Sequence, residues 1–351
     1  MNRETKTIII LSPAFPANES ETYWVPSQQL MVTALKKNFP ATNIIVLSFL
    51  YPYHKSAFSW HGIEVISFDG MHRRKFNRLF LFRDAWKTLK KKKKEHNVIG
   101  LFSFWCGECA LVGKWFGKWH KIKHYCWICG QDARKGNKLI KWIRPAADEL
   151  VAMSPFLLNE FEKNHHVRPS YLVENAVDPA LFPPAGGERT IDLLGVGSFE
   201  PLKQYDVFTE VVRSVQVQIN KIRAKHCGIG REKEKIQSLI KKFGLEENFH
   251  LLGGRPHEEV LKLMQQSKIF LHTSRYEGFS TVCLEALYAG CHVVSFLKPI
   301  EREIKHWHVV TTQQDMVEKC LQLLESRELD FERVLLYSME DSARKVMNLF
   351  N

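Results

Sequence analysis

Short runs of β-branched and other apolar residues recur along the chain, separated by segments in which apolar residues follow helical spacing. Strands that alternate with helices predict βαβ units and therefore a parallel sheet covered by helices. Ten strands are predicted in two series, 7–11, 43–47, 98–102, 125–128 and 149–152 in the first half, then 191–196, 222–227, 248–252, 269–273 and 292–295.

Each series predicts its own doubly wound sheet, and 351 residues are enough for two α/β domains with separate cores. Residues 178–189 interrupt the pattern with three prolines and two glycines, which predicts an interdomain linker. From residue 331 onward the pattern is helical and contains no strand, so we expect this segment to pack across the domain boundary. The expected parts are 1–182, 190–330 and 331–351.

The composition is that of an ordered globular protein, with 45% hydrophobic and 25% charged residues. No apolar run approaches the roughly 20 residues that cross a bilayer, and the early run 7–11 is too short for a signal peptide. Eight cysteines without a secretion signal are typical of reduced thiols rather than of a disulfide framework. We therefore expect a cytoplasmic protein without structural disulfides.

The formal charge of +12 is concentrated in one segment, 73–94, in which aromatic residues interleave with basic ones near helical spacing. Such a segment suits a basic amphipathic helix on anionic lipid head groups. Nucleic acid would satisfy the charge equally well, and a solvated helix whose apolar stripe packs on its own domain is the third interpretation. The basic residues are Arg73, Arg74, Lys75, Arg78, Arg83, Lys87 and the run 90–94.

Two C-x2-C pairs, Cys106 with Cys109 and Cys126 with Cys129, have sixteen residues between them, which is a zinc-ribbon spacing. The second pair falls in a predicted strand, where residues three apart point to opposite faces. We therefore expect no metal site and keep zinc as an alternative.

Two glycine-containing segments follow strands of the second series. Gly195 and Gly197 lie at the end of the strand 191–196, and the loop that follows leads to Lys203 at the start of a helix. Small residues in such a loop let the backbone approach a phosphate, and the lysine can neutralise its charge. The third glycine of a dinucleotide-binding fingerprint is absent. Gly228 and Gly230 follow the next strand, on the edge where open α/β sheets bind ligands.

The segment 274–290 predicts a strand end, a glycine turn and a helix that opens near Ser280. The free amides and positive dipole end of that helix would bind an anion such as a diphosphate. Glu277 lies before the helix and Glu285 lies inside it, so the two carboxylates would meet different parts of one ligand. The alternative is an ordinary capped helix with one exposed acid.

Taken in order and spacing, these motifs resemble the nucleotide-binding domain of family 4 of the retaining glycosyltransferases, which have the GT-B fold of two facing Rossmann-like domains. The resemblance includes the glycine-to-lysine loop, the Gly228 and Gly230 turn, the segment ending at Arg255 and the E-x7-E signature at Glu277 and Glu285. It is looser in the first half, at 151–154 and 174–178. The end, 337–350, resembles the helix by which such chains return to the first domain.

The resemblance implies an N-terminal acceptor-binding domain, a C-terminal nucleotide-sugar-binding domain and a UDP- or GDP-linked sugar as co-substrate, with no cofactor. It makes Lys203 the group that stabilises the departing diphosphate and Glu277 the group that holds the transferred sugar, both catalytic. Glu285 would bind the ribose. The implied donor-binding residues are Gly197, Ser198, Gly230, Gly253, Arg255, Phe279, Ser280, Thr281 and Glu285.

The chain departs from the family pattern at three places. Ser198 stands where an arginine is usual, so Arg231 or Arg275 would have to meet one phosphate charge. The glycine-rich loop after the first strand is replaced by the glycine-free segment 13–24, and Cys129 precedes Gly130 where His-Gly is common. The acceptor side therefore looks specialised, and its candidate contacts are Glu108, Asp132 and Arg134.

Retention in this family is usually explained by front-face attack, in which the departing phosphate accepts the acceptor's proton. This fits a sequence without a G-x-S-x-G elbow or a catalytic dyad. The expected function is a metal-independent retaining hexosyltransferase acting on a glycan or a lipid-linked or surface-polysaccharide acceptor, with 73–94 touching the inner membrane face. A catalytically weak GT-B scaffold and a basic nucleic-acid-binding protein are the alternatives.

Overall fold

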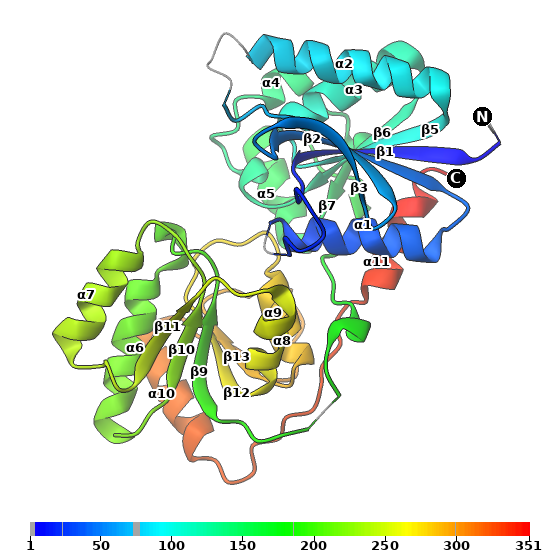
Figure 1. Ribbon diagram of the computed structural model, residues 1–351. Coiled ribbons are helices and arrows are strands. Elements are labelled where there is room, and N and C mark those ends of the chain that lie inside the picture. Colours follow the sequence, from blue (N-terminus) through cyan, green and yellow to red (C-terminus); the bar gives the residue numbers. More distant parts are fainter. Residues whose placement is uncertain (1–3, 23, 73–77, 185, 299) are drawn as a thin grey trace. The chain divides into compact units, whose positions relative to one another are not determined.

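The computed structural model describes residues 4–22, 24–72, 78–184, 186–298 and 300–351. Contacts divide the chain into two compact units, residues 1–175 with 339–351 and residues 176–338. Each unit is a mainly parallel sheet with helices on both faces, so the predicted α/β fold class is confirmed (Figure 1). The ten predicted strands are all present, and β3, β4, β8 and β14 are additional to the prediction.

The described residues of the first unit form an eight-stranded sheet in the order β3-β4-β2-β1-β5-β6-β7-β8. Neighbouring strands are parallel except β3 and β4, which form an antiparallel hairpin. The strands are β1 (Lys6–Ala14), β2 (Asn43–Tyr51), β3 (Lys55–Trp60), β4 (Ile63–Phe68), β5 (Asn97–Phe104), β6 (Lys123–Ile128), β7 (Leu150–Ala152) and β8 (Tyr171–Leu172).

The β3–β4 hairpin has a local sequence signal that a pattern of parallel strands does not include. Its two-residue turn is His61 and Gly62, both with positive φ, 46° and 73°. Positive φ at both central residues is the requirement of the turn that matches the twist of a hairpin. Residues alternate in burial along β4, and Trp60 packs edge-on against Phe15, with ring centroids 4.8 Å apart.

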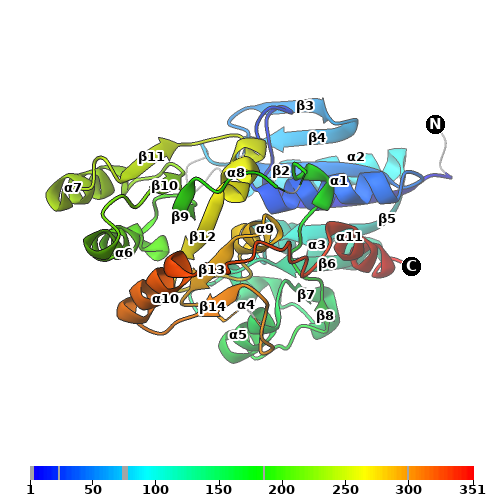
Figure 2. The ribbon, with the colours of Figure 1, turned by 90° about the horizontal axis from the view of Figure 1, so that it is seen from below.

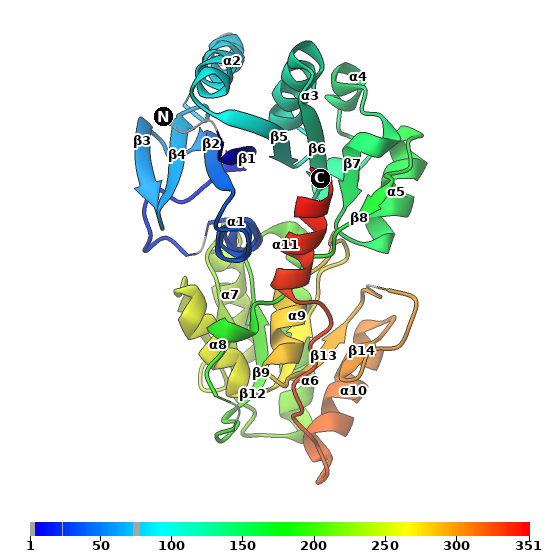
Figure 3. The ribbon, with the colours of Figure 1, turned by 90° about the vertical axis from the view of Figure 1, so that its right-hand side faces the viewer.

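Helices α2 (Arg78–Glu95), α3 (Glu108–His120) and α4 (Ile140–Ile143) lie side by side on one face of the first sheet (Figure 3). Helix α2 buries Leu81, Ala85 and Leu89 against that face. Phe82 and Trp86 are partly buried against the same core, whereas Leu79 and Phe80 are exposed. Packing of the apolar stripe on its own domain is therefore confirmed in part, and the lipid and nucleic-acid interpretations stay predictions. Arg73, Arg74 and Lys75 lie outside the described residues.

The opposite face carries α1 (Pro26–Asn38) and the last helix, α11 (Met339–Asn348), and α5 (Pro155–His165) lies beside β7 (Figure 3). Lys345 Nζ pairs with Glu174 Oε2 at 2.5 Å, and Ser342 Oγ donates to the Glu174 carbonyl. The Phe350 ring fills the space that a side chain at Gly100 would need. The return of the last helix to the first unit is therefore confirmed.

The described residues of the second unit form a six-stranded sheet in the order β11-β10-β9-β12-β13-β14, with parallel neighbours (Figure 2). The strands are β9 (Ile191–Val196), β10 (Ala224–Cys227), β11 (Phe249–Gly253), β12 (Ser267–His272), β13 (His292–Ser295) and β14 (Trp307–Val309). One face carries α6 (Tyr205–Gln218), α7 (Lys233–Phe243) and α10 (Gln313–Glu325); the other carries α8 (His257–Gln265) and α9 (Thr281–Tyr288) (Figure 1).

Strand order reverses once in each sheet. In the second unit the chain moves from β9 outward through β10 to β11, then returns to β12 on the other side of β9. In the first unit the corresponding reversal lies between β1 and β5. Loops that follow the two central strands diverge at such a point, and ligands of open α/β sheets bind in the resulting crevice.

Candidate active site

The glycines after β9 and β10 allow two loops to pack backbone against backbone. A Cβ added at Gly228 would lie 1.9 Å from the Gly197 carbonyl oxygen, and one at Gly230 would lie 2.5 Å from the Phe199 nitrogen. A Cβ at Gly197 would lie 2.5 Å from the Tyr205 hydroxyl. No side chain fits at these three positions, so the glycine spacing has a structural cause in addition to the predicted approach of a phosphate.

The loop after β11 joins the same edge. The Gly228 amide donates to the Gly253 carbonyl at 2.9 Å, and Gly253 has a positive φ of 74° with open space where a side chain would point. Arg255 Nε donates to the Leu252 carbonyl at 3.2 Å, while its guanidinium lies 3.5 Å from Glu259. The structure thus brings the loop with the predicted donor-binding residues Gly253 and Arg255 next to the two glycine turns.

Lys203 is the last residue of a single helical turn, Pro201–Lys203, which is hydrogen-bonded to the residues that directly follow β12. Thr273 Oγ1 donates to the Lys203 carbonyl at 2.7 Å, and Ser274 Oγ donates to the Leu202 carbonyl at 3.3 Å. These bonds hold the Lys203 backbone at the reversal between β9 and β12. Its side chain forms an ion pair with Glu277, and both side chains are mostly buried, 25% and 20% exposed.

Glu277 is held between two cationic side chains. In addition to Lys203, His272 Nε2 lies 3.5 Å from Glu277 Oε1. Burial raises the pKa of the Glu277 carboxyl, but His272 and Lys203 lower it by more, to about 2. Glu277 is therefore ionised at neutral pH although it is largely out of solvent.

His272 is a site residue that the sequence analysis missed. Burial lowers its pKa, but Cys283 and Glu277 raise it by more, to about 9, so the ring is cationic at neutral pH. Its Nε2 also lies 3.4 Å from Ser280 Oγ at the start of α9. A signal was available, because His272 stands at the carboxyl end of a predicted parallel strand, where ligand-binding residues gather.

Glu285 also has a histidine partner. His257, the first residue of α8, places Nε2 at 2.7 Å from Glu285 Oε1, and the Glu285 side chain is only 4% exposed. Burial lowers the pKa of His257, and the Glu285 carboxylate raises it by more, so the net shift is upward. Nothing in the sequence around His257 pointed to this contact, since 28 residues separate the pair.

Helix α9 begins at Thr281 with Ser280 as the preceding cap residue, which confirms the predicted helix start. Phe279 is buried and packs edge-on against Tyr337, with ring centroids 5.7 Å apart. Ser280 is buried, and Thr281 is partly buried. The three predicted phosphate-binding positions therefore lie at the first turn of a helix on the same edge as His272.

Ser198 is exposed in the loop after β9, where the family pattern has an arginine. Of the two arginines considered as substitutes, Arg231 pairs with Glu200 at 2.8 Å on the surface, and Arg275 is exposed in the segment after β12. Both follow strands of the second sheet at the carboxyl edge.

The predicted acceptor residues belong to the first unit. Asp132 is buried, and its two carboxylate oxygens accept the amides of Cys106, Cys129 and Gly130 at 2.7–3.3 Å. Burial raises the pKa of its carboxyl, partly offset by these amides. Asp132 thus joins the loops after β5 and β6. Arg134 is exposed, and Glu108 is partly buried in the first turn of α3.

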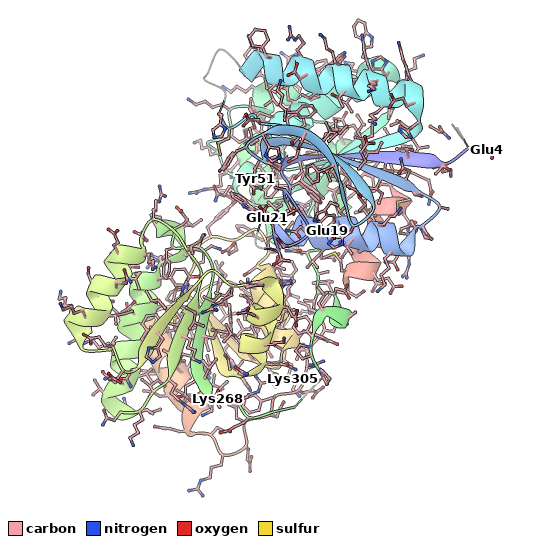
Figure 4. All side chains as sticks on the ribbon, in the orientation of Figure 1. Glu4, Glu19, Glu21, Tyr51, Lys268 and Lys305 are labelled. Carbon is pink, nitrogen blue, oxygen red and sulfur yellow. The ribbon has the colours of Figure 1, made fainter. Side chains whose placement is uncertain are left out.

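The glycine-free segment after β1 is held by contacts of its own side chains (Figure 4). Glu21 Oε2 accepts hydrogen bonds from the Ala17 amide at 2.9 Å and from the Tyr51 hydroxyl at 2.7 Å. The Trp24 ring stacks on Tyr51, with centroids 4.4 Å apart. Bulky side chains therefore fill the edge where the family pattern has a glycine-rich loop.

All eight cysteines are free thiols. Burial raises the pKa of Cys109, Cys126 and Cys129. Within the described ranges, no group of three or more His, Cys, Asp or Glu side chains is arranged to hold a metal ion. Over the same residues, no helix combines the length and the apolar character that spanning a membrane would need.

Comparison with known proteins gives a consistent picture. Residues 183–333 match the family model described as glycosyl transferases group 1. Over 203 residues the chain is 25% identical to the gpi3 subunit of phosphatidylinositol N-acetylglucosaminyltransferase from Schizosaccharomyces pombe, covering 56% of this chain and 44% of the relative. It is 27% identical over 211 residues to poly(ribitol-phosphate) alpha-N-acetylglucosaminyltransferase from Staphylococcus aureus, covering 56% and 41%. The chain spans less than half of the length of these relatives.

Among solved structures, the chain is similar to HepE from Anabaena in complex with UDP and glucose. The TM-score is 0.70 at 14% sequence identity, over 98% of this chain and 95% of that one. This likeness concerns the fold and extends through both units. Most of the second unit is therefore similar to glycosyl transferases group 1, and the fold of the chain is that of the GT-B proteins, with two parallel-sheet α/β domains.

Proposed function

We propose that the chain transfers a sugar from a nucleotide-sugar donor, and that the donor binds at the carboxyl edge of the second sheet, between β9 and β12. The observation that carries this proposal is the cluster of Lys203, His272 and Glu277 at the strand-order reversal, where two cations surround one carboxylate. Beside it, the three glycine positions bring the loops after β9 and β10 close together, so that no side chain at these positions stands over the cluster.

In the proposed complex the donor diphosphate competes with Glu277 for Lys203. His272 remains against Glu277 and keeps that carboxylate ionised, so Glu277 can accept hydrogen bonds from hydroxyls of the sugar. The first-turn amides of α9, near Phe279, Ser280 and Thr281, add donors to the phosphates. The remaining proposed donor contacts are Gly197, Ser198 and Gly230 at the phosphates, Glu285 at the ribose, and Gly253 and Arg255 at the base.

The proposed reaction is retaining and needs no nucleophile from the protein. The bond between the sugar C1 and the phosphate oxygen breaks, and the acceptor oxygen bonds to C1 on the same face. The acceptor's proton passes to the departing phosphate oxygen. Lys203 offsets the negative charge that grows on the diphosphate, so we propose that side chains of this unit, rather than a metal ion, supply the electrostatic stabilisation.

We propose UDP-N-acetylglucosamine as the first donor to test. Two relatives are named as N-acetylglucosaminyltransferases, and a structurally similar protein is described with UDP. GDP-linked sugars remain the second donor class. We propose that the acceptor binds the first unit, and a lipid-linked or surface-polysaccharide intermediate is its proposed class, with Glu108 and Arg134 as candidate contacts.

A thermal-shift screen with UDP, GDP and their sugar conjugates tests the proposal, because a ligand of the native state raises its stability. We expect stabilisation by one nucleotide family, lost in Lys203→Ala and kept in Lys268→Ala. Lys268 is a matched control, since it forms a 2.8 Å ion pair with Asp192 at the opposite end of β12 (Figure 4).

Release of free UDP or GDP from the stabilising donor, measured with candidate acceptors, then tests transfer itself. Turnover that depends on Lys203 supports an active enzyme. Nucleotide binding without turnover on any acceptor would favour the catalytically weak scaffold, and no nucleotide binding by folded protein would contradict the proposal.

A further inference from the structure

The excess positive charge of the chain belongs to one unit. Residues 1–175 with 339–351 contain 29 Lys and Arg against 16 Asp and Glu, whereas residues 176–338 contain 21 against 22. The basic residues of the first unit are themselves concentrated in the segment 78–144, which has 17 basic and 4 acidic residues. This segment contains α2, α3 and α4, the three helices on one face of the first sheet, together with β5, β6 and the loops between these elements.

The same three helices expose large apolar side chains. All nine tryptophans lie in the described part of the chain, and the three that are exposed are Trp115 at 40%, Trp119 at 77% and Trp142 at 71%. Trp115 and Trp119 belong to α3, and Trp142 belongs to α4. Helix α2 adds Leu79 and Phe80, which are 71% and 47% exposed.

Exposed residues of α3 and α4 contact one another, and α2 packs beside α3. Trp115 Nε1 donates to the Trp142 carbonyl at 3.2 Å, which joins α3 to α4. Lys118 Nζ lies 5.3 Å from the centre of the Trp115 ring. We call this surface the tryptophan–lysine face. It comprises Leu79, Phe80, Trp115, Trp119 and Trp142 with the exposed basic residues Arg83, Lys87, Lys90, Lys118, Lys141 and Arg144.

We propose that the tryptophan–lysine face docks on the surface of an anionic lipid bilayer. Indole rings favour the boundary between head groups and acyl chains, because an apolar body is joined to one polar N–H. Lysines and arginines around them attract anionic head groups. Helix α2 cannot supply this contact alone, since Leu81, Ala85 and Leu89 are committed to the core. The new elements are the tryptophans of α3 and α4.

A bilayer fits this face better than nucleic acid does. Leu79 and Phe80 are exposed on α2, which packs beside α3. Apolar side chains such as these gain little from a phosphate backbone, whereas they gain from acyl chains. In the second unit the exposed large apolar residues are single aliphatic side chains in separate elements, Leu181, Val217, Ile229, Val309 and Leu335. The docking proposal is independent of the proposed sugar transfer.

Vesicle co-sedimentation of the full chain tests the proposal. We expect the protein to partition onto vesicles of phosphatidylcholine with about one-third phosphatidylglycerol at about 0.1 M salt, and to remain in solution with phosphatidylcholine alone. Tryptophan emission should shift to the blue on binding, since Trp119 and Trp142 would leave water.

The double variant Trp119→Ala, Trp142→Ala should lower partitioning at least about tenfold, and Lys118→Glu, Lys141→Glu should do the same. All four side chains are exposed, so the variants should keep the wild-type melting temperature. The matched control on the second unit is Val217→Ala with Lys241→Glu and Lys242→Glu, which are also exposed. It should partition as wild type.

Several outcomes would overturn the proposal. They are absence of binding to anionic vesicles at low salt, wild-type partitioning by both double variants, and an equal loss in the control. Salt-sensitive binding of nucleic acid without vesicle binding would assign the face to that partner instead.

Discussion

The reversal points of the two sheets have the same topology and different side chains. At the edge between β9 and β12, glycines pack backbone on backbone, and a lysine, a histidine and a glutamate gather beside them. At the edge between β1 and β5, the rings of Phe15, Trp24 and Tyr51 fill the space around the loop that follows β1. The buried Asp132 accepts a backbone amide of the loop that follows β5 and so holds that loop in place.

This difference follows from what each edge can accommodate. Small residues with cationic neighbours leave room and charge for a diphosphate, which UDP-linked and GDP-linked sugar donors share. In the first unit, bulky rings and a buried carboxylate occupy the corresponding edge of the sheet and determine the shape of its surface. Under the proposed function, the second unit would carry the shared donor chemistry, whereas the first would carry what is particular to this protein.

The largest effect that would test this contrast is expected at Gly228. Gly228→Ala should destabilise the second unit by more than about 4 kcal/mol or prevent folding, because the new methyl would overlap the Gly197 carbonyl. Gly254→Ala is the control, since its nearest contact would be an ordinary 3.5 Å. Urea unfolding measures both variants, and equal stabilities would contradict the backbone packing described.

Asp132 tests the first unit in the same way. Asp132→Ala should cost about 3 kcal/mol, because three backbone amides lose their acceptor in a buried loop. Stabilisation by a donor nucleotide should persist, since that site is proposed in the other unit. Denaturation with and without nucleotide provides the measurement, and a stable variant with a raised KM for acceptor would instead make Asp132 an acceptor contact.

His272 should make stability depend on pH in a defined direction. Its folded pKa of about 9 exceeds the unfolded value of 6.5, so its contribution is complete below about pH 6.5 and disappears as pH rises through 9. Wild type should melt about 4 °C above His272→Gln at pH 6, and the gap should close by about pH 10. A constant gap across that range would refute the cationic assignment.

The smallest predicted effect concerns Glu285. If this carboxylate binds the ribose, wild type should prefer UDP over 2′-deoxyuridine diphosphate by about tenfold, and Glu285→Gln should lose most of that preference. Glu258→Gln is the control, because Glu258 is 72% exposed and pairs only with Lys262 among the ion pairs described. Competition binding provides the measurement, and unchanged discrimination in Glu285→Gln would remove the ribose role.

The sequence predicted those features that depend on local spacing. Apolar runs located ten strands, and the glycines after β9 and β10 marked an edge where the structure admits no side chain. The hairpin turn at His61 and Gly62 was equally local, and it was missed because a parallel sheet was expected throughout.

Other features depend on contacts between distant residues. His257 reaches Glu285 across 28 residues, and Lys203 reaches Glu277 across 74. Asp132 resembled a polar loop residue, and only its burial reveals the three amides that it accepts. Likewise, the spacing of Trp115 and Trp119 indicates a shared helix face, but the packing of α3 on the sheet decides that this face is the exposed one.

The central claim is that the donor site lies at Lys203 in the second unit. Calorimetric titration of UDP and UDP-N-acetylglucosamine into wild type, Lys203→Ala and Lys268→Ala tests it most directly. Binding to wild type and Lys268→Ala with at least about a tenfold weaker affinity in Lys203→Ala is the predicted result. Equal affinities in the two lysine variants, both shown to be folded, would contradict it.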